Sequence, residues 1–114
     1  MKELLIAFLV LFMIPPEPIP LGEFKCTAYC SCSTCCGEWA DGITYTGGHA
    51  TENRTIAVDP DVIPLGSVVE INGQEYIAED IGGAIKGNHI DVYFEDHQTA
   101  LEWGVQKHEV YPIN

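Results

Sequence analysis

AEDIGGAIKGNHIDVYF, residues 78–94, is the stretch that decides the fold, because it joins two strand-like segments through a loop with three glycines. In the second segment, residues 89–95, side chains alternate with the period of two that is typical of a β-strand. Ile90 and Val92 fall on one face, which we expect to be the core. The opposite face carries three residues suited to a polar site: His89, Asp91 and Tyr93.

Short strand-like runs recur along the rest of the chain, and one segment is typical of a helix. The expected strands are residues 24–30, 55–60, 62–71, 74–80, 89–95 and 108–113. Asn72-Gly73 between two of these runs predicts a type I′ hairpin. Residues 96–105 predict a short helix that Asp96 caps and Gly104 ends. Evenly spaced short strands favour an all-β domain, a small closed six-stranded barrel with one short helix.

The N-terminal segment has a different composition. Lys2 precedes an uninterrupted apolar run, residues 4–14, which is too short to span a bilayer as a helix. Such a run predicts a secretory signal peptide, with an uncleaved anchor or a disordered tail as alternatives. Four prolines in residues 15–22 predict an extended spacer. We therefore expect residues 1–23 to be a signal or anchor with its spacer, and residues 24–114 to be the folded domain.

The charge balance excludes several kinds of partner. The chain contains five Lys and Arg residues and 17 Asp and Glu residues, which gives a net charge of -12. Nucleic acids and anionic membrane surfaces both require a basic face, so neither is expected to bind. Membrane association is expected only through the N-terminal segment, if that segment is uncleaved. The glycine-rich loop lacks the spacing of a phosphate-binding loop, and we expect a monomer without cofactor or metal.

The aspartates are the strongest candidates for chemistry. Alternation places Tyr76, Ala78 and Asp80 on one face of residues 74–80, and the loop at 81–88 can return the chain so that Asp80 and Asp91 meet. Asp59, at the end of another expected strand, can join them. Two close carboxylates cannot both ionise easily, so one acquires a raised pKa and can act as a general acid. The alternative is that these aspartates only cap turns.

The segments TIAVDP, IPLGS and AEDIGGAIKGNHIDVYF resemble the 3D domain, which is named for three aspartates and is related to the barrel of the lytic transglycosylase MltA. The resemblance implies a double-psi β-barrel that cleaves the β-1,4 bond between MurNAc and GlcNAc and leaves a 1,6-anhydro sugar. It implies a catalytic role for Asp91 as the acid, with Asp80 polarising it and Asp59 supporting the site. It also implies a protein that is secreted or located in the cell wall, where peptidoglycan glycan strands are its partner.

Contacts to the glycan are expected from five further residues: Thr46, Gly82, Gly83, Lys86 and Tyr93. The sequence departs from the family pattern at Ile81, where the family usually has threonine, and at His89, where it usually has arginine. Two alternatives to the lytic enzyme stay open. One is a glycoside hydrolase on the same scaffold, which needs a second carboxylate across the sugar, and the other is a module that binds wall glycans without cutting them.

Five cysteines form a separate cluster of candidates: Cys26, Cys30, Cys32, Cys35 and Cys36. Outside the cell, disulfides are the default, although the odd number leaves one thiol over. A zinc site or reduced thiols are the alternatives. Four of the cysteines lie within seven residues, however, whereas structural zinc sites usually draw ligand pairs from two separated segments. His97 and His108 are expected at the surface without a special role.

Overall fold

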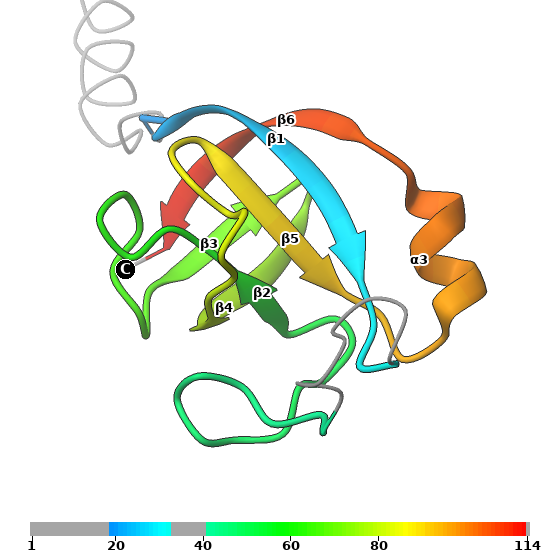
Figure 1. Ribbon diagram of the computed structural model, residues 1–114. Coiled ribbons are helices and arrows are strands. Elements are labelled where there is room, and N and C mark those ends of the chain that lie inside the picture. Colours follow the sequence, from blue (N-terminus) through cyan, green and yellow to red (C-terminus); the bar gives the residue numbers. More distant parts are fainter. Residues whose placement is uncertain (1–18, 33–40, 114) are drawn as a thin grey trace, which may run out of the picture.

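The computed structural model describes residues 19–32 and 41–113, which form a barrel of short strands with one helix beside it (Figure 1). The elements are β1 (Gly22–Tyr29), β2 (Thr55–Ala57), β3 (Val68–Ile71), β4 (Gln74–Asp80), β5 (His89–Tyr93), α3 (His97–Trp103) and β6 (Gln106–Ile113). The apolar run at residues 4–14 lies outside the described residues, as do Cys35 and Cys36. Within the described ranges, no helix is long and apolar enough to cross a membrane.

The strands close into a barrel in the order β1-β5-β2-β4-β3-β6. Two pairs are parallel, β1 with β5 and β2 with β4. The remaining pairs are antiparallel, including the pair of β6 with β1 that closes the barrel. The prediction of a small six-stranded barrel of the double-psi type with one short helix is therefore confirmed.

Strand alternation fills the barrel with apolar side chains. Ile90 and Val92 of β5 are buried, as the period of two predicted. They belong to a cluster that also contains residues from all five remaining strands, among them Phe24, Cys26, Ile56, Val69, Ile71, Ala78 and Val110. The helix α3 packs against this core through Trp103, whose indole N–H donates to the Cys26 carbonyl at 3.0 Å.

The local signals for turns and caps also hold. Asn72 and Gly73 both have positive φ angles, 50° and 83°, as a type I′ turn between β3 and β4 requires. The Asp96 carboxylate accepts a hydrogen bond from the Thr99 backbone N–H at 3.0 Å and caps α3. Gly104 ends the helix with a φ of 67°.

Candidate active site

Asp80 and Asp91 flank a single residue of the barrel. Ala57 of β2 pairs with Asp91 of β5 on one side and with Asp80 of β4 on the other. Neighbouring strands lie about 4.8 Å apart, so the two aspartate Cα atoms are roughly 10 Å apart across β2. Both aspartates line the same cavity, together with the small Ala57 between them.

A β-bulge changes the direction of Asp80. Ile56 pairs with Ala78, but the next residue, Ala57, pairs with Asp80, so Glu79 is an extra residue in β4. Strict alternation would place Asp80 on the face of the buried Ala78, and the bulge breaks that alternation. Bulges often re-aim a side chain in this way beside functional sites. Asp80 is therefore partly exposed and lines a cavity. The alternation of residues 74–80 did not predict this exposure, because it contains no sign of the bulge.

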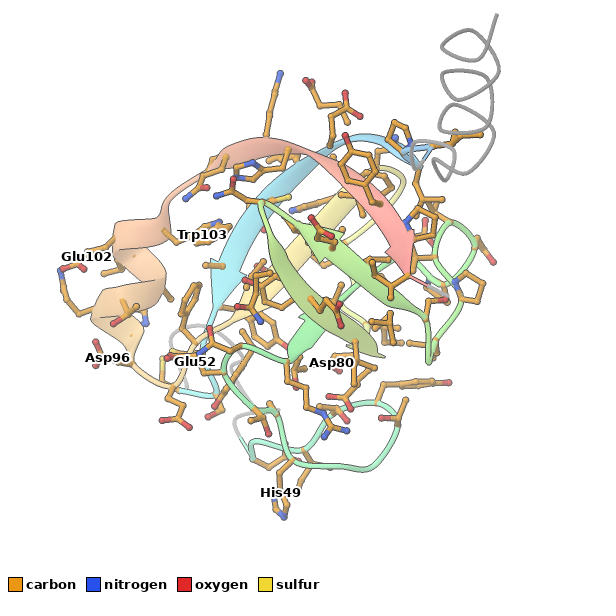
Figure 2. All side chains as sticks on the ribbon, turned by 180° about the vertical axis from the view of Figure 1, so that it is seen from behind. His49, Glu52, Asp80, Asp96, Glu102 and Trp103 are labelled. Carbon is orange, nitrogen blue, oxygen red and sulfur yellow. The ribbon has the colours of Figure 1, made fainter. Side chains whose placement is uncertain are left out.

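A cavity of about 700 Å³ lies over these residues. Five of the site residues expected from the sequence line it: Asp80, Asp91, Gly82, Gly83 and Tyr93. The other walls come from the end of β1, from the loop after β4 and from residues 41–50. Figure 2 shows Asp80 at the end of the barrel next to the segment that carries His49. The volume falls in the range of small-molecule sites.

Three donors hold the Asp80 carboxylate in place. The Tyr29 hydroxyl donates to Oδ2 at 2.8 Å. The backbone N–H groups of Tyr45 and Ile81 donate to Oδ1 at 2.9 and 3.0 Å. Tyr29 is itself fixed by an edge-to-face contact with Tyr93, with ring centroids 5.4 Å apart. Asp80 thus ties three separate segments of the chain to one wall of the cavity.

Asp91 is half-buried, and its partner in β1 is a side chain. Thr27 of β1, its parallel neighbour in the register, donates its hydroxyl to Asp91 Oδ1 at 2.9 Å. The same Thr27 oxygen lies 2.8 Å from His89 Nε2. Because the hydroxyl has a single proton and uses it on Asp91, the His89 N–H is the donor in that second bond. His89, Thr27 and Asp91 thus form one hydrogen-bonded chain.

The environment raises the pKa of Asp91 above its ordinary value. Burial is the largest cause, because desolvation disfavours the charged carboxylate. The Thr27 hydrogen bond and the charge of His89 lower the pKa, and the negative charge of Asp80 raises it. The sequence argument attributed the raised pKa to Asp80. The direction holds, but burial contributes more than the neighbouring charge.

Asp59 lies outside the cavity lining and fixes the glycine-rich loop. Its carboxylate accepts hydrogen bonds from the backbone N–H of Gly87 at 2.9 Å and of Asp61 at 3.0 Å. These bonds, and more weakly the charge of Lys86, lower the pKa of Asp59. Asp59 therefore resembles the turn cap that was the alternative interpretation of all three aspartates, and it positions the loop that leads into β5.

Two other expected glycan contacts also lie outside the residues that line the cavity. Thr46 is exposed, and its hydroxyl shares a hydrogen bond of 3.0 Å with Thr44, which does line the cavity. Lys86 is exposed on the loop near Asp59. Their contact with substrate stays a prediction.

Sequence reasoning missed the contribution of β1. Thr27 and Tyr29 alternate with core residues just as Asp91 and Tyr93 do on β5, so the polar face of residues 24–30 was a usable signal. The pairing partner of that face was not visible, because β1 and β5 are more than 60 residues apart in the sequence and no local pattern sets their register.

Comparison with solved structures defines the class of barrel. The crystal structure of MltA from E. coli matches with a TM-score of 0.53 and 26% sequence identity. The match covers 63% of this chain and 27% of the MltA chain. The barrel is therefore similar to part of a lytic transglycosylase.

Comparison of sequences gives the family. The model of the 3D domain matches residues 54–114, and the chain belongs to the 3D domain family. A putative cell wall shaping protein of Bacillus subtilis, YabE, is 46% identical over 77% of this chain and 22% of its own length. The cell wall-binding protein YocH of the same organism is 48% identical over 64% of this chain and 27% of its own length. The chain thus spans about a quarter of these curated relatives.

Proposed function

We propose that this barrel cleaves peptidoglycan glycan strands as a lytic transglycosylase, with Asp91 as general acid and base. The observation that carries the proposal is the Asp91 carboxyl, which lines a cavity and whose pKa burial raises. A carboxyl group with a raised pKa keeps its proton to higher pH than an ordinary aspartate and can protonate a leaving glycosidic oxygen.

The proposed reaction needs one acid and no water. Asp91 gives its proton to the glycosidic oxygen as the bond from that oxygen to C1 of MurNAc breaks. The 6-hydroxyl of the same MurNAc forms a new bond to C1 and returns its proton to the Asp91 carboxylate. The products are a free GlcNAc hydroxyl and a 1,6-anhydro end, and the enzyme regains its starting protonation state.

The surrounding residues have supporting roles in this scheme. The Thr27 hydroxyl stabilises the charge that develops on Asp91 as its proton leaves. The charge of Asp80 on the same cavity favours an oxocarbenium-like sugar between the two carboxylates. Gly82 and Gly83 let the backbone approach a sugar closely, and Tyr93 offers an aromatic ring at the cavity wall.

The comparisons support a role at the cell wall. The relatives bear cell wall names, and the similar structure is that of a lytic transglycosylase. We accordingly propose peptidoglycan as the partner and a location outside the cytoplasm, which is also what a signal peptide or anchor with its spacer at residues 1–23 would give.

Two other functions remain candidates on specific observations. The name of YocH favours a module that binds the wall without cutting it. Asp41 favours a hydrolase, because it adds a third carboxylate to the cavity lining and could activate water from another side.

Digestion of purified sacculi distinguishes these functions. The chain and its Asp91→Asn variant are incubated with sacculi, and released muropeptides are analysed by mass. A lytic enzyme releases products one water lighter than those of a hydrolase, and Asp91→Asn should abolish release while it keeps binding to sacculi. Reducing ends in place of anhydro ends would establish the hydrolase. Binding without any release by the unsubstituted chain would refute the catalytic proposal.

A further inference from the structure

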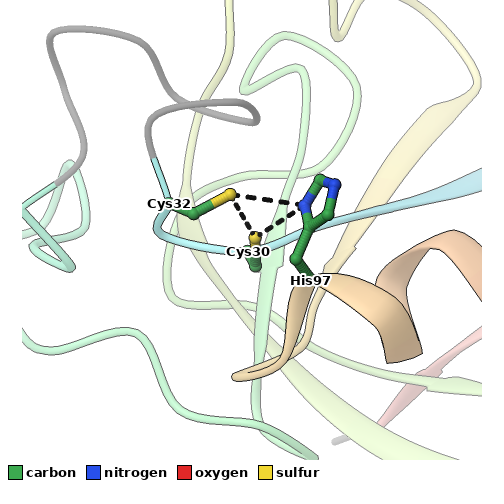
Figure 3. Close-up of side chains that lie close together, drawn as sticks. All are labelled: Cys30, Cys32 and His97. Atoms are coloured by element: carbon green, nitrogen blue, oxygen red, sulfur yellow. Dashed lines mark hydrogen bonds between the residues drawn. The ribbon is translucent and has the colours of Figure 1, made fainter.

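Two thiols and one imidazole converge beside the cavity (Figure 3). His97 Nδ1 lies 3.3 Å from Cys30 Sγ and 3.3 Å from Cys32 Sγ, and the two sulfur atoms are 2.9 Å apart. Cys30 is buried, and the other two residues are half-buried. The sequence predicted a surface position without a special role for His97, and the structure instead directs its ring at both sulfur atoms.

The parallel pairing of β1 with β5 brings these residues together. Tyr29 pairs with Tyr93, and the Phe94 backbone N–H donates to the Tyr29 carbonyl at 2.8 Å, so both strands end at the same edge. Cys30 and Cys32 follow directly after β1. His97 is the first residue of α3, which begins four residues after β5 ends. The ligands therefore come from two segments far apart in the sequence, as is usual for structural zinc sites.

The three atoms have the chemistry of a zinc site and lie close enough together to share one ion. Cysteine thiolates and imidazole nitrogens are the preferred ligands of Zn²⁺, at about 2.0–2.3 Å. The three atoms are separated by 2.9, 3.3 and 3.3 Å, so a point about 2.2 Å from each exists outside their plane. The sulfur atoms are farther apart than the bond of about 2.05 Å in a disulfide. The net charge of -12 also favours the binding of a cation.

We propose that Cys30, Cys32 and His97 bind a zinc ion that ties the end of β1 to the start of α3. A further ligand completes the tetrahedron. The ion would hold one wall of the cavity, because Ser31 lies between the two cysteines and lines that wall. The Ser31 hydroxyl also shares a hydrogen bond of 3.2 Å with the Tyr93 hydroxyl. Tyr29, the residue before Cys30, holds Asp80. This role is structural and departs from the expectation that the protein has no metal; metal binding itself does not depend on the proposed glycan cleavage.

The test measures metal content and coordination without any activity assay. The full chain is purified with reductant, loaded with Zn²⁺ and desalted, and its zinc is quantified; about one equivalent per chain is expected. Replacement by Co²⁺ should give the absorption bands of thiolate ligands in a tetrahedral site. Cys30→Ser, Cys32→Ser and His97→Ala should each weaken binding by at least about 100-fold.

Cys26→Ser and His108→Ala are the matched controls. Cys26 is a buried thiol in the barrel core, and His108 is a half-buried imidazole near Trp103; neither belongs to the cluster of Cys30, Cys32 and His97. Both controls should keep full zinc content if they fold, as judged by circular dichroism. Equal zinc loss in the controls, or full retention in the three ligand variants, would overturn the proposal.

Alkylation distinguishes zinc from a disulfide. The chain is prepared without reductant and alkylated before and after chelation, and the modified cysteines are located by mass. A zinc site predicts that Cys30 and Cys32 are protected until a chelator is added. If both react only after reduction and chelation has no effect, they form disulfides and the zinc proposal is wrong.

Discussion

Thr27→Val tests the proposed chemistry of Asp91 most directly. Valine has nearly the shape of threonine, so the change removes the hydroxyl and leaves the β1 backbone and its pairing with β5 in place. Asp91 Oδ1 then loses the donor at 2.9 Å, and His89 Nε2 loses its acceptor at 2.8 Å. Thr27→Ser keeps the hydroxyl and serves as the control.

The size of the effect follows from the charge that the hydrogen bond stabilises. A hydrogen bond to a charged group contributes about 1.5–3 kcal/mol. In the proposed reaction the charge forms on Asp91 as its proton leaves, so the bond is stronger in the transition state than in the ground state. At about 1.36 kcal/mol per tenfold change in rate, Thr27→Val should reduce kcat by about 10- to 150-fold.

The pH dependence adds a second signature. Activity of a general acid falls as the pH rises through its pKa. The Thr27 bond lowers the pKa of Asp91 because it favours the charged form, so its removal should move the alkaline limb of the profile to higher pH. The assay is release of anhydro-muropeptides from sacculi across a pH series, with thermal unfolding as the folding check. Unchanged kcat and an unshifted limb in Thr27→Val, or equal damage in Thr27→Ser, would refute the assigned role.

Four further substitutions are predicted from the same geometry. Asp91→Asn should stabilise the fold at neutral pH. A carboxyl group with a raised pKa destabilises the folded state once the pH rises above 3.8, the ordinary pKa of aspartate. Thermal unfolding should show that the extra stability of the variant disappears below that pH. Asp59→Asn should destabilise the fold at neutral pH, because the pKa of Asp59 is lowered and its ionised form stabilises the folded state. The difference in melting temperature from the unsubstituted chain should become smaller in acid. A difference that grows as the pH falls would contradict this. Gly82→Ala places a Cβ 3.0 Å from Ile85 Cγ1 and should cost about 1–3 kcal/mol in denaturant unfolding. Gly83→Ala meets nothing within 4 Å and should stay within about 0.5 kcal/mol of the unsubstituted chain.

Local patterns predicted much of the fold. Alternation on residues 89–95 identified the buried Ile90 and Val92, and Asn72-Gly73 predicted the hairpin between β3 and β4. Asp96 and Gly104 predicted the two ends of the helix α3. These features are predictable because each depends on the conformational preference or face of a few consecutive residues.

The candidate site was predictable only in part. The glycine-rich loop and the aspartates at its two ends indicated that Asp80 and Asp91 share a site, and both line the cavity. The cause of the raised pKa of Asp91 was not visible, since burial depends on how the barrel closes around that side chain. The sequence also gave no reason to separate Asp59, which binds backbone, from the other two aspartates.

The sequence by itself determined which side chains face the core, where turns and the helix form, and which acidic residues border the loop. Only the tertiary structure decided that Thr27 lies opposite Asp91, that a bulge at Glu79 turns Asp80 toward the cavity, and that His97 meets Cys30 and Cys32. The physical reason is that strand register and bulges are set by closure of the whole barrel. That closure depends on hydrogen bonds and packing between segments that are far apart in the sequence, more than 60 residues for β1 and β5, and local sequence does not specify them.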